Sequence, residues 1–318
     1  MTNTAFINTA KLDFNNDLDF SPLENITDFS RHNARTGDEL LQLVQNKSIL
    51  ISKEFPLDKD LIAQFPPSVK LICEAGTGYN NIDLAAARDR NIAVCNVPGY
   101  STGAVAQLAV TLMLNLSISL VRQQIMIHKK QFDNFTRHIQ VPLCEIHDKT
   151  LGVIGFGAIA QQVTSVARSL GMNILVHTRT PNPELHPDLR FVCIEDLLRH
   201  SDFVSIHCPL TIDTHHLIDK AKLQLMKPSA CIVNTSRGAL IDETDLIEAL
   251  RNGTIAGAGL DVQDPEPPEL TNPLFAMENV ILTPHIGWKS FETRQRLVMF
   301  LAENIESFLR GTRKNRIV

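Results

Sequence analysis

The feature that most constrains the fold is a series of short apolar runs that alternate with stretches of helical character. Most of the runs end in glycine, proline or a polar residue. The runs span residues 70–73, 91–95, 151–154, 173–177, 203–207, 230–233, 255–261 and 280–282. Continuous apolar runs of this length are typical of parallel strands that are buried on both faces of a sheet. The alternation therefore predicts a doubly wound α/β fold.

One of these runs, residues 151–154, leads into a glycine-rich turn and then into a helical stretch over 161–170. In the G-x-G-x-x-A spacing, the first glycine makes a tight turn and the second lets the backbone approach a pyrophosphate. The third position packs helix on strand, and the helix N-terminus faces the phosphates. A purely structural glycine turn is the alternative. We interpret the turn as a dinucleotide-binding motif formed by Gly155, Phe156, Gly157, Ala158, Ile159 and Ala160.

The next predicted strand, residues 173–177, ends in Thr178, Arg179 and Thr180. In NAD-binding sites an acidic residue about 20 positions past the glycines accepts the ribose 2′-hydroxyl. Thr178 stands about where that carboxylate belongs, and the cation that comes after it suits a 2′-phosphate. The alternative is that Arg179 is only a solvated loop residue. The sequence favours NADP over NAD.

The motif at Gly155 begins near the middle of the 318-residue chain, whose length favours two domains. The simplest arrangement inserts a complete dinucleotide-binding domain, residues 99–287, into a second domain made of residues 1–98 and 288–318. Ligands of open α/β sheets bind at the carboxyl ends of the strands. We therefore expect the active site in a cleft between the two domains.

Three polar segments in the C-terminal third, which carry Arg237, Glu266 and His285, each follow a predicted strand. Reduction of a 2-keto acid needs a cation for the carboxylate and carbonyl, and a proton donor for the developing alkoxide. Arg237 has the fork of donors for the first task, and His285 is the natural general acid. Glu266 can hydrogen-bond the imidazole and favour its protonated form. Each residue alone has a structural explanation, but together, downstream of a dinucleotide motif, they indicate a catalytic trio.

Through these segments, the sequence resembles the D-isomer-specific 2-hydroxyacid dehydrogenases over essentially its whole length. Residues 75–83 resemble the family's substrate loop, whose backbone N–H groups receive the carboxylate, and residues 96–102 resemble its interdomain hinge. The segments with Arg237, Glu266 and His285 match the family's catalytic positions. The resemblance implies substrate contacts by Ala75, Gly76, Thr77, Gly78, Arg237 and His285.

The resemblance also implies the rest of the cofactor site. The run after residue 206 resembles the loop beside the nicotinamide ribose, and Asp261 matches a residue that contacts the nicotinamide end. The additional expected contacts are His207, Cys208, Pro209, Thr235, Ser236, Asp261, His285 and Gly287. Ala160 replaces the family's usual third glycine, which is sterically mild, and the missing acidic residue puts NAD in doubt.

Within the family, the segments 98–102 and 284–288 resemble most the glycerate dehydrogenase and hydroxypyruvate/glyoxylate reductase group. This implies an oxidoreductase with two Rossmann-like domains that acts on a small 2-keto or 2-hydroxy acid. It also implies a homodimer built on the cofactor domain and a long helix over about residues 101–130.

Two other functions compete with this interpretation. A dinucleotide-sensing protein like the corepressors that share this fold is disfavoured by retention of the trio. Formate dehydrogenase-like enzymes carry glutamine where Glu266 stands, because hydride loss from formate needs no proton donor.

The remaining composition narrows the partners. The net charge is −5 and no block of five or more basic residues occurs, which argues against nucleic acid and membrane surfaces. The N-terminus lacks a signal-peptide pattern and no apolar run has the length of a membrane span, so we expect a cytoplasmic protein. Six scattered cysteines without a C-x-x-C pair predict buried free thiols and no metal site.

Overall fold

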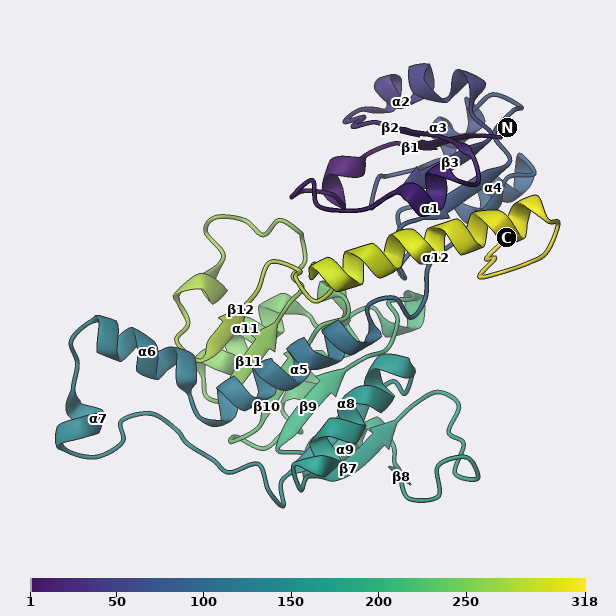
Figure 1. The fold of residues 1–318 in the computed structure, drawn as a ribbon. Coiled ribbons are helices and arrows are strands. Elements are labelled where there is room, and N and C mark those ends of the chain that lie inside the picture. Colours follow the sequence, from purple (N-terminus) through teal and green to yellow (C-terminus); the bar gives the residue numbers. More distant parts are fainter. Residues whose placement is uncertain (1) are drawn as a thin grey trace. The chain divides into compact units, whose positions relative to one another are not determined.

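The computed structural model describes residues 2–318 and divides the chain into two compact units. One is formed by the chain up to Ser101 together with Trp288–Val318, and the other by Thr102–Gly287. The first crossing thus lies after residue 101, where the sequence placed it after residue 98. Each unit is built around one parallel sheet (Figure 1), and the predicted α/β class is confirmed.

The unit with the glycine motif has, over the described residues, a seven-stranded sheet in the order β12-β11-β10-β9-β6-β7-β8. Its strands are β6 (Thr150–Ile154), β7 (Asn173–His177), β8 (Arg190–Phe191), β9 (Phe203–Ile206), β10 (Cys231–Asn234), β11 (Gly257–Leu260) and β12 (Val280–Leu282). If β6 is taken as the first strand of the domain, the sheet has the strand order 3-2-1-4-5-6 of dinucleotide-binding domains, with one further strand, β12, at the end. The order reverses between β6 and β9, where such sheets bind their ligands.

Helices cover both faces of this sheet. On one face α5 (Thr102–Ser117) and α8 (Ala158–Ser169) bury a cluster that includes Val153, Val163 and Val233. The other face packs against α9 (Ile194–His200), α10 (Lys220–Leu223) and α11 (Glu243–Arg251). Burial on both faces explains why the strands are continuous apolar runs.

The single helix predicted over about residues 101–130 is wrong. The segment forms α5 and a second helix, α6 (Leu120–His128), that meet at a bend of 61°. Ser119 adopts a left-handed backbone with φ 49°, and its hydroxyl donates to the Pro142 carbonyl at 2.6 Å. Serine side chains offer the backbone such alternatives to helical hydrogen bonds. No single helix within residues 2–318 has the length and apolar character to cross a membrane, although this bent pair together meets both criteria.

The other unit has, within the described chain, a five-stranded sheet in the order β2-β1-β3-β4-β5. Its strands are β1 (Asn3–Phe6), β2 (Asp28–Arg31), β3 (Ile49–Ser52), β4 (Leu71–Glu74) and β5 (Ala93–Cys95). This is the flavodoxin-like order, which reverses between β1 and β3. One face packs against α1 (Ser21–Glu24) and α12 (Phe291–Leu309), and the other against α2 (Gly37–Leu43), α3 (Lys59–Ala63) and α4 (Leu84–Asp89).

The cysteines match the expectation only where they lie in or next to the sheets. Cys73, Cys95 and Cys231 are buried free thiols and Cys208 is half-buried. Cys144 and Cys193 are free but exposed, so the prediction of buried thiols fails at these two positions. Both lie outside the strands, and Cys193 is the N-cap residue of α9.

Candidate active site

The glycine turn after β6 has the geometry that its sequence predicts. Gly155 has φ 84°, and its N–H donates to the His177 carbonyl at 2.7 Å. A Cβ on Gly155 would lie 2.6 Å from the Cys208 nitrogen, so only glycine fits. Gly157 caps α8 without a side-chain hydrogen bond, and a Cβ there would meet nothing within 4 Å. This leaves room for a phosphate beside the first N–H groups of α8.

Among the remaining positions of the motif, only the packing of Ala160 was predicted. Ala160 is fully buried in the cluster that joins α8 to the sheet. The Phe156 ring contacts Phe191 edge-on at 6.3 Å and His186 at 5.1 Å. Ala158 is exposed and Ile159 is half-buried at the start of α8.

The segment proposed to select the cofactor lies next to this turn. Ile154 pairs with His177 across β6 and β7, so Thr178 comes at the level of Gly155. Thr178 is half-buried, whereas Arg179 and Thr180 are exposed. The Arg179 guanidinium forms no ion pair or hydrogen bond with any residue between 2 and 318.

The loop after β9 lies at the same carboxyl edge of the sheet as the glycine turn. Ile154 also pairs with Ile206, and the His207 N–H donates to the Ile154 carbonyl at 2.7 Å. The His207 Nε2 lies 2.8 Å from the Ser205 hydroxyl, and its Nδ1 is buried without a partner in the described structure. Burial lowers the pKa of His207 to about 4, so this imidazole is neutral at physiological pH.

Glu266 and His285 form a hydrogen-bonded pair. The Glu266 Oε2 lies 2.8 Å from the His285 Nδ1, and its Oε1 accepts from the Gln263 N–H at 2.9 Å. Partial burial raises the pKa of Glu266, but the hydrogen bond and charge of His285 outweigh it and leave the pKa below its ordinary value. Glu266 is therefore a carboxylate that fixes one nitrogen of the ring and leaves the other, Nε2, as the one that can act on a substrate.

Asp261 holds the loop that carries His285. Its side chain is buried, and its Oδ1 accepts from the Ile286 N–H (2.8 Å) and the Thr283 hydroxyl (2.6 Å). Its Oδ2 accepts from the Gly287 N–H at 2.9 Å. His285 itself has φ 51°, a conformation that its N–H supports by donating to the Asp261 carbonyl at 2.9 Å. The structure thus gives Asp261 a positioning role that the sequence did not indicate.

Arg237 belongs to the same cluster. It comes after β10, its carbonyl accepts from the Asn234 side chain at 2.8 Å, and its Nη1 donates to the Ser236 carbonyl at 2.7 Å. A Cβ on Gly238 would lie 2.1 Å from the Gln263 carbonyl, so the two loops meet at that glycine. The charge of Arg237 is among the causes that lower the pKa of Glu266. The adjacent Thr235 has a buried hydroxyl without a partner among the described residues.

The predicted substrate loop lies in the other unit, after β4. The Gly76 carbonyl accepts from the Val97 N–H at 2.8 Å, and the Asn96 side chain donates to the Thr77 carbonyl at 2.7 Å. The Ala75 N–H donates to the Ser52 carbonyl at 2.6 Å. In contrast, the N–H groups of residues 76–78 donate to no residue that the structure describes. A loop that is held by its carbonyls and keeps successive N–H groups available suits a carboxylate.

Two buried ionisable residues beside this loop were not among the predicted site residues. The Lys53 side chain is 3% exposed, and Glu74 is fully buried. A Cβ on Gly76 would lie 3.5 Å from the Lys53 Nζ and 3.8 Å from the Glu74 Oε1. The sequence held a signal for Lys53, because this lysine comes soon after the apolar run 49–51. The other predicted site residues also follow apolar runs.

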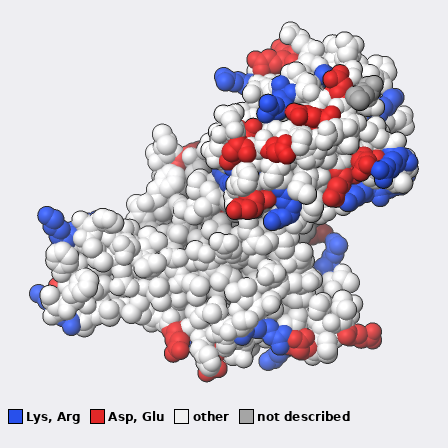
Figure 2. Space-filling view, viewed as in Figure 1, with Lys and Arg blue, Asp and Glu red and all other residues white. Residues whose placement is uncertain are grey.

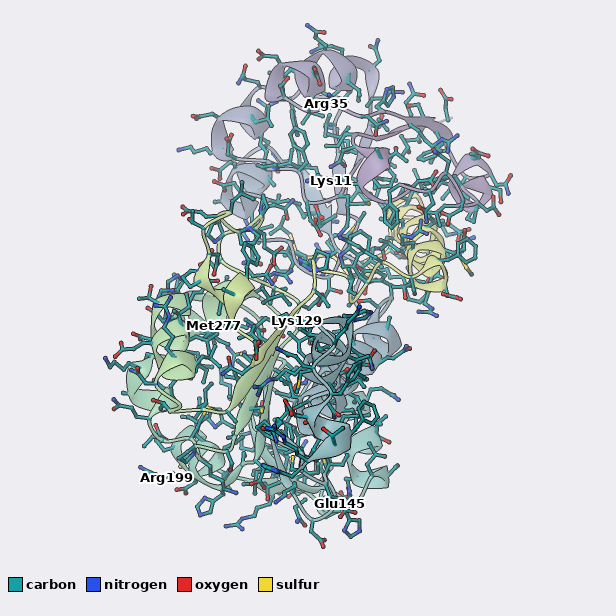
Figure 3. All side chains as sticks on the ribbon, turned by 90° about the vertical axis from the view of Figure 1, so that its left-hand side faces the viewer. Lys11, Arg35, Lys129, Glu145, Arg199 and Met277 are labelled. Atoms are coloured by element: carbon teal, nitrogen blue, oxygen red, sulfur yellow. The ribbon has the colours of Figure 1, made fainter. Side chains whose placement is uncertain are left out.

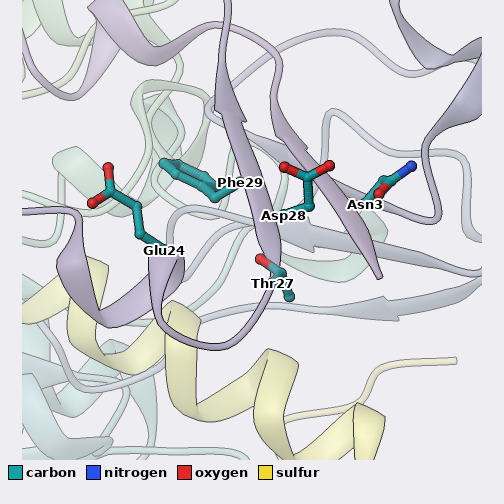
Figure 4. A pocket seen from close by; sticks show the side chains of 5 residues that line it. All are labelled: Asn3, Glu24, Thr27, Asp28 and Phe29. Carbon is teal, nitrogen blue, oxygen red and sulfur yellow. The ribbon is translucent and has the colours of Figure 1, made fainter. Parts of the chain in front are cut away.

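A shallow pocket elsewhere in this unit has no such features. It is lined by Asn3, Glu24, Thr27, Asp28 and Phe29 (Figure 4). Asn3 and Asp28 are the first residues of β1 and β2, so the pocket lies at the amino ends of strands. Ligands of such sheets bind at the carboxyl ends, and we assign the pocket no role.

A dinucleotide-type sheet with a glycine turn and an Arg, Glu and His cluster at its carboxyl edge defines a dinucleotide-dependent oxidoreductase. Residues 110–287 match the family model of the D-isomer specific 2-hydroxyacid dehydrogenase NAD binding domain. The chain is 33% identical over 305 residues to a hydroxypyruvate reductase of Blautia hydrogenotrophica, covering 94% of each protein. It is 38% identical to a glyoxylate reductase of Thermococcus litoralis, over 87% of this chain and 82% of that protein.

The chain therefore belongs to the D-isomer-specific 2-hydroxyacid dehydrogenase family. A solved structure of an acyclic imino acid reductase in complex with NADPH and D-Arg superimposes with a TM-score of 0.87 at 29% identity, covering all of both chains. Members of this family bind a nicotinamide dinucleotide, and the predicted family and enzyme class are confirmed.

Proposed function

We propose that this protein reduces a small 2-keto acid of the hydroxypyruvate or glyoxylate type to the D-2-hydroxy acid. The observation that carries the proposal is the hydrogen bond of 2.8 Å between Glu266 and His285, together with the charge of Arg237, which helps to lower the pKa of Glu266. A carboxylate that holds an imidazole beside a guanidinium supplies a proton donor and a carbonyl-polarising cation together. The names of the two relatives support the substrate type.

In the proposed reaction, the N–H groups of residues 76–78 receive the substrate carboxylate. Arg237 donates to the carbonyl oxygen and stabilises the negative charge that develops on it. His285 donates a proton from Nε2 to that oxygen, and Glu266 stabilises the ring in the orientation for this transfer. The bound reduced nicotinamide supplies the hydride that C2 receives. The substrate thereby gains one hydride and one proton, and the imidazole regains its proton from solvent.

We further propose that the cofactor is NADP(H). Arg179 is exposed without a partner in the described structure, at the level of the glycine turn, and Thr178 places no carboxylate there. A guanidinium binds a phosphate through two parallel hydrogen bonds, whereas NAD offers a hydroxyl at that position. The NADPH in the solved imino acid reductase is compatible with this choice.

We also propose a homodimer built on the unit Thr102–Gly287, which carries the glycine turn and is called the cofactor unit below. The segment 118–143, which includes α6 and α7 (Asp133–Thr136), exposes a set of large apolar side chains, and Figure 2 shows almost no charge in the middle of this unit's visible face, with charged side chains at its edges. The exposed residues include Ile118, Leu120, Phe132, Phe135, Ile139 and Leu143. Exposed apolar surface of this extent marks an interaction site in most proteins. Light scattering that finds only monomers at micromolar concentration would reject the dimer.

Absorbance at 340 nm tests the enzymatic proposal. The purified protein is mixed with NADPH or NADH and a panel containing hydroxypyruvate, glyoxylate, pyruvate and phenylpyruvate, and the product is analysed on a chiral column. We expect oxidation of the cofactor with hydroxypyruvate or glyoxylate, faster with NADPH, and a D-product from hydroxypyruvate.

The alternatives give different outcomes in the same assay. A dinucleotide-sensing protein would bind NADPH without oxidising it with any member of the panel. A formate dehydrogenase-like enzyme would reduce the oxidised cofactor with formate, and would not require His285 as a proton donor.

A further inference from the structure

Lys53 occupies a position where sheets of this type bind ligands. It comes directly after β3, and the strand order of its sheet reverses between β1 and β3. Loops at the carboxyl ends of the strands beside such a reversal form the binding crevice of doubly wound sheets. The loop 75–78 comes after β4, the next strand in the sheet, so the lysine and the available N–H groups of that loop lie on the same edge.

The backbone around Lys53 is fixed on both sides. The Asn8 side chain accepts from the Lys53 N–H at 2.9 Å and donates to the Lys53 carbonyl at 2.6 Å. The next residue, Glu54, has φ 54°, and its N–H donates to the buried Glu74 Oε1 at 2.8 Å. Lys11, labelled in Figure 3, donates to the Glu54 carbonyl at 3.4 Å. These contacts hold the lysine in place before any ligand binds.

The Lys53 ammonium is buried but retains donor capacity. Its Nζ donates to the Glu54 carboxylate at 2.5 Å and lies 3.9 Å from the centre of the Trp288 ring. An ammonium has three donors, and burying a cation is costly unless they find acceptors. Its distance of 3.5 Å from the Cβ position of Gly76 puts the remaining donors beside the loop.

We propose that Lys53 is a substrate-binding residue whose ammonium, together with the N–H groups of residues 76–78, binds the carboxylate of the 2-keto acid. This inference rests on the proposed function and adds a specific contact to it. The Glu54 side chain is 47% exposed and can move into solvent when an anion takes its place. Glu74 holds the backbone by accepting from the Glu54 N–H and from the Asn81 side chain at 3.0 Å. Its charge attracts the Lys53 ammonium, but the two form no direct ion pair in the described structure.

Steady-state kinetics with three variants tests this role. Lys53→Met removes the charge at similar length, Lys53→Arg keeps a cation, and Lys59→Met is the control, because Lys59 is an exposed lysine at the start of α3 in the same unit. We expect Lys53→Met to raise KM for the keto acid by tenfold or more, as loss of a charge-assisted hydrogen bond does, while KM for NADPH stays within twofold. Lys53→Arg should recover part of the loss, and Lys59→Met should match the wild type.

A binding measurement separates substrate contact from structure. Trp288 is the chain's single tryptophan and lies against Lys53, so its fluorescence reports on this site. Oxamate, an unreactive analogue of a 2-keto acid, should change the emission of the wild type saturably and bind Lys53→Met at least tenfold more weakly. A Lys53 with only a structural role would instead lower the unfolding midpoint on substitution and leave KM and the oxamate affinity unchanged, which overturns the inference.

Different results would reject the role of Lys53 and the proposed function. If the wild type oxidises NADPH with the panel but Lys53→Met keeps the wild-type KM, only the role of Lys53 is rejected. If the wild type neither turns over any 2-keto acid nor binds oxamate, the proposed function is rejected and this inference with it. If Lys53→Met does not fold, Lys53→Gln decides: a raised KM that Lys53→Arg partly restores supports the charge, and an unchanged KM for Lys53→Gln contradicts it.

Discussion

Each of the two sheets carries a glycine-containing loop at its own carboxyl edge. The two loops differ in the helix that each one enters. In the cofactor unit, Gly155–Gly157 leads directly into α8, a helix of 12 residues that has no side-chain cap. In the other unit, residues 75–83 separate β4 from α4, a helix of 6 residues whose first turn is capped by the Asp83 side chain, which accepts from the Ala86 N–H at 2.9 Å.

This difference accounts for the two kinds of anion site that we propose. In the cofactor unit the free N–H groups belong to a helix terminus, whose dipole suits the extended charge of a pyrophosphate. In the other unit the Asp83 side chain caps the helix terminus, and the N–H groups without a partner in the described structure belong to the loop itself. There a buried ammonium, Lys53, adds the charge that the capped helix does not offer. In our proposal, the same architecture binds different anions because the cap and the loop length differ.

The largest expected effect concerns catalysis in the cofactor unit, as distinct from substrate binding in the other unit. His285→Ala removes the proton donor and should lower kcat by about 10²–10⁴-fold, with a small change in KM. This contrasts with Lys53→Met, which is expected to act on KM. Stopped-flow measurement of the first turnover would check that the chemical step is the one slowed. Turnover at the wild-type rate would show that His285 is not the proton donor.

The second effect tests the glycine turn. Gly155→Ala forces a Cβ onto a left-handed residue and against the Cys208 backbone, and should lower the free energy of unfolding by about 3 kcal/mol. Gly157→Ala meets open space and should leave the free energy of unfolding within about 0.5 kcal/mol of the wild type. It should still weaken NADPH binding, because the methyl group occupies the approach of the pyrophosphate. Urea unfolding and cofactor titration measure the two quantities, and equal destabilisation by both variants would contradict the proposed role of the turn.

The third effect is a pH dependence in the other unit. Burial, the largest cause, raises the pKa of Glu74 from 4.5 to about 7, although Lys53 and hydrogen bonds oppose the rise. The folded state thus holds this proton more tightly than the unfolded state, and the associated stability is lost as pH rises from about 4.5 through about 7. Relative to Glu74→Gln, the wild type should lose about 2 kcal/mol of unfolding free energy between about pH 5 and about pH 8. Parallel pH profiles for the two proteins would show that Glu74 titrates normally.

The smallest effect distinguishes the cofactors. Arg179→Ala should raise KM for NADPH about tenfold and change KM for NADH less than about twofold, because only the 2′-phosphate pairs with the guanidinium. Arg190→Ala is a control, since Arg190 is an exposed arginine in the neighbouring strand β8. Equal losses for NADPH and NADH would reject the phosphate contact.

Most strands are predictable from the sequence because each one coincides with a short apolar run in the chain. The runs at 173–177 and 280–282 coincide with β7 and β12, and the other predicted runs lie within a few residues of their strands. Strands β1, β2, β3 and β8 were not predicted. Strand β8 has only two residues and β2 is only partly buried, so neither forms a continuous apolar run. The break in the predicted long helix rests on one left-handed residue, Ser119, whose hydroxyl bonds a distant carbonyl.

The sequence by itself determined the α/β class, the dinucleotide turn at Gly155 and the chemical types of the proposed trio, because these depend on local spacing and on side-chain chemistry. The tertiary structure decided which partners those side chains have: Asp261 under the His285 loop, Glu266 on its imidazole, and Lys53 and Glu74 beside residue 76. These contacts join segments that are far apart in the chain, and only the pairing of strands brings their carboxyl ends to one edge. The burial that shifts the pKa of Glu74 and confines the ammonium of Lys53 has the same origin.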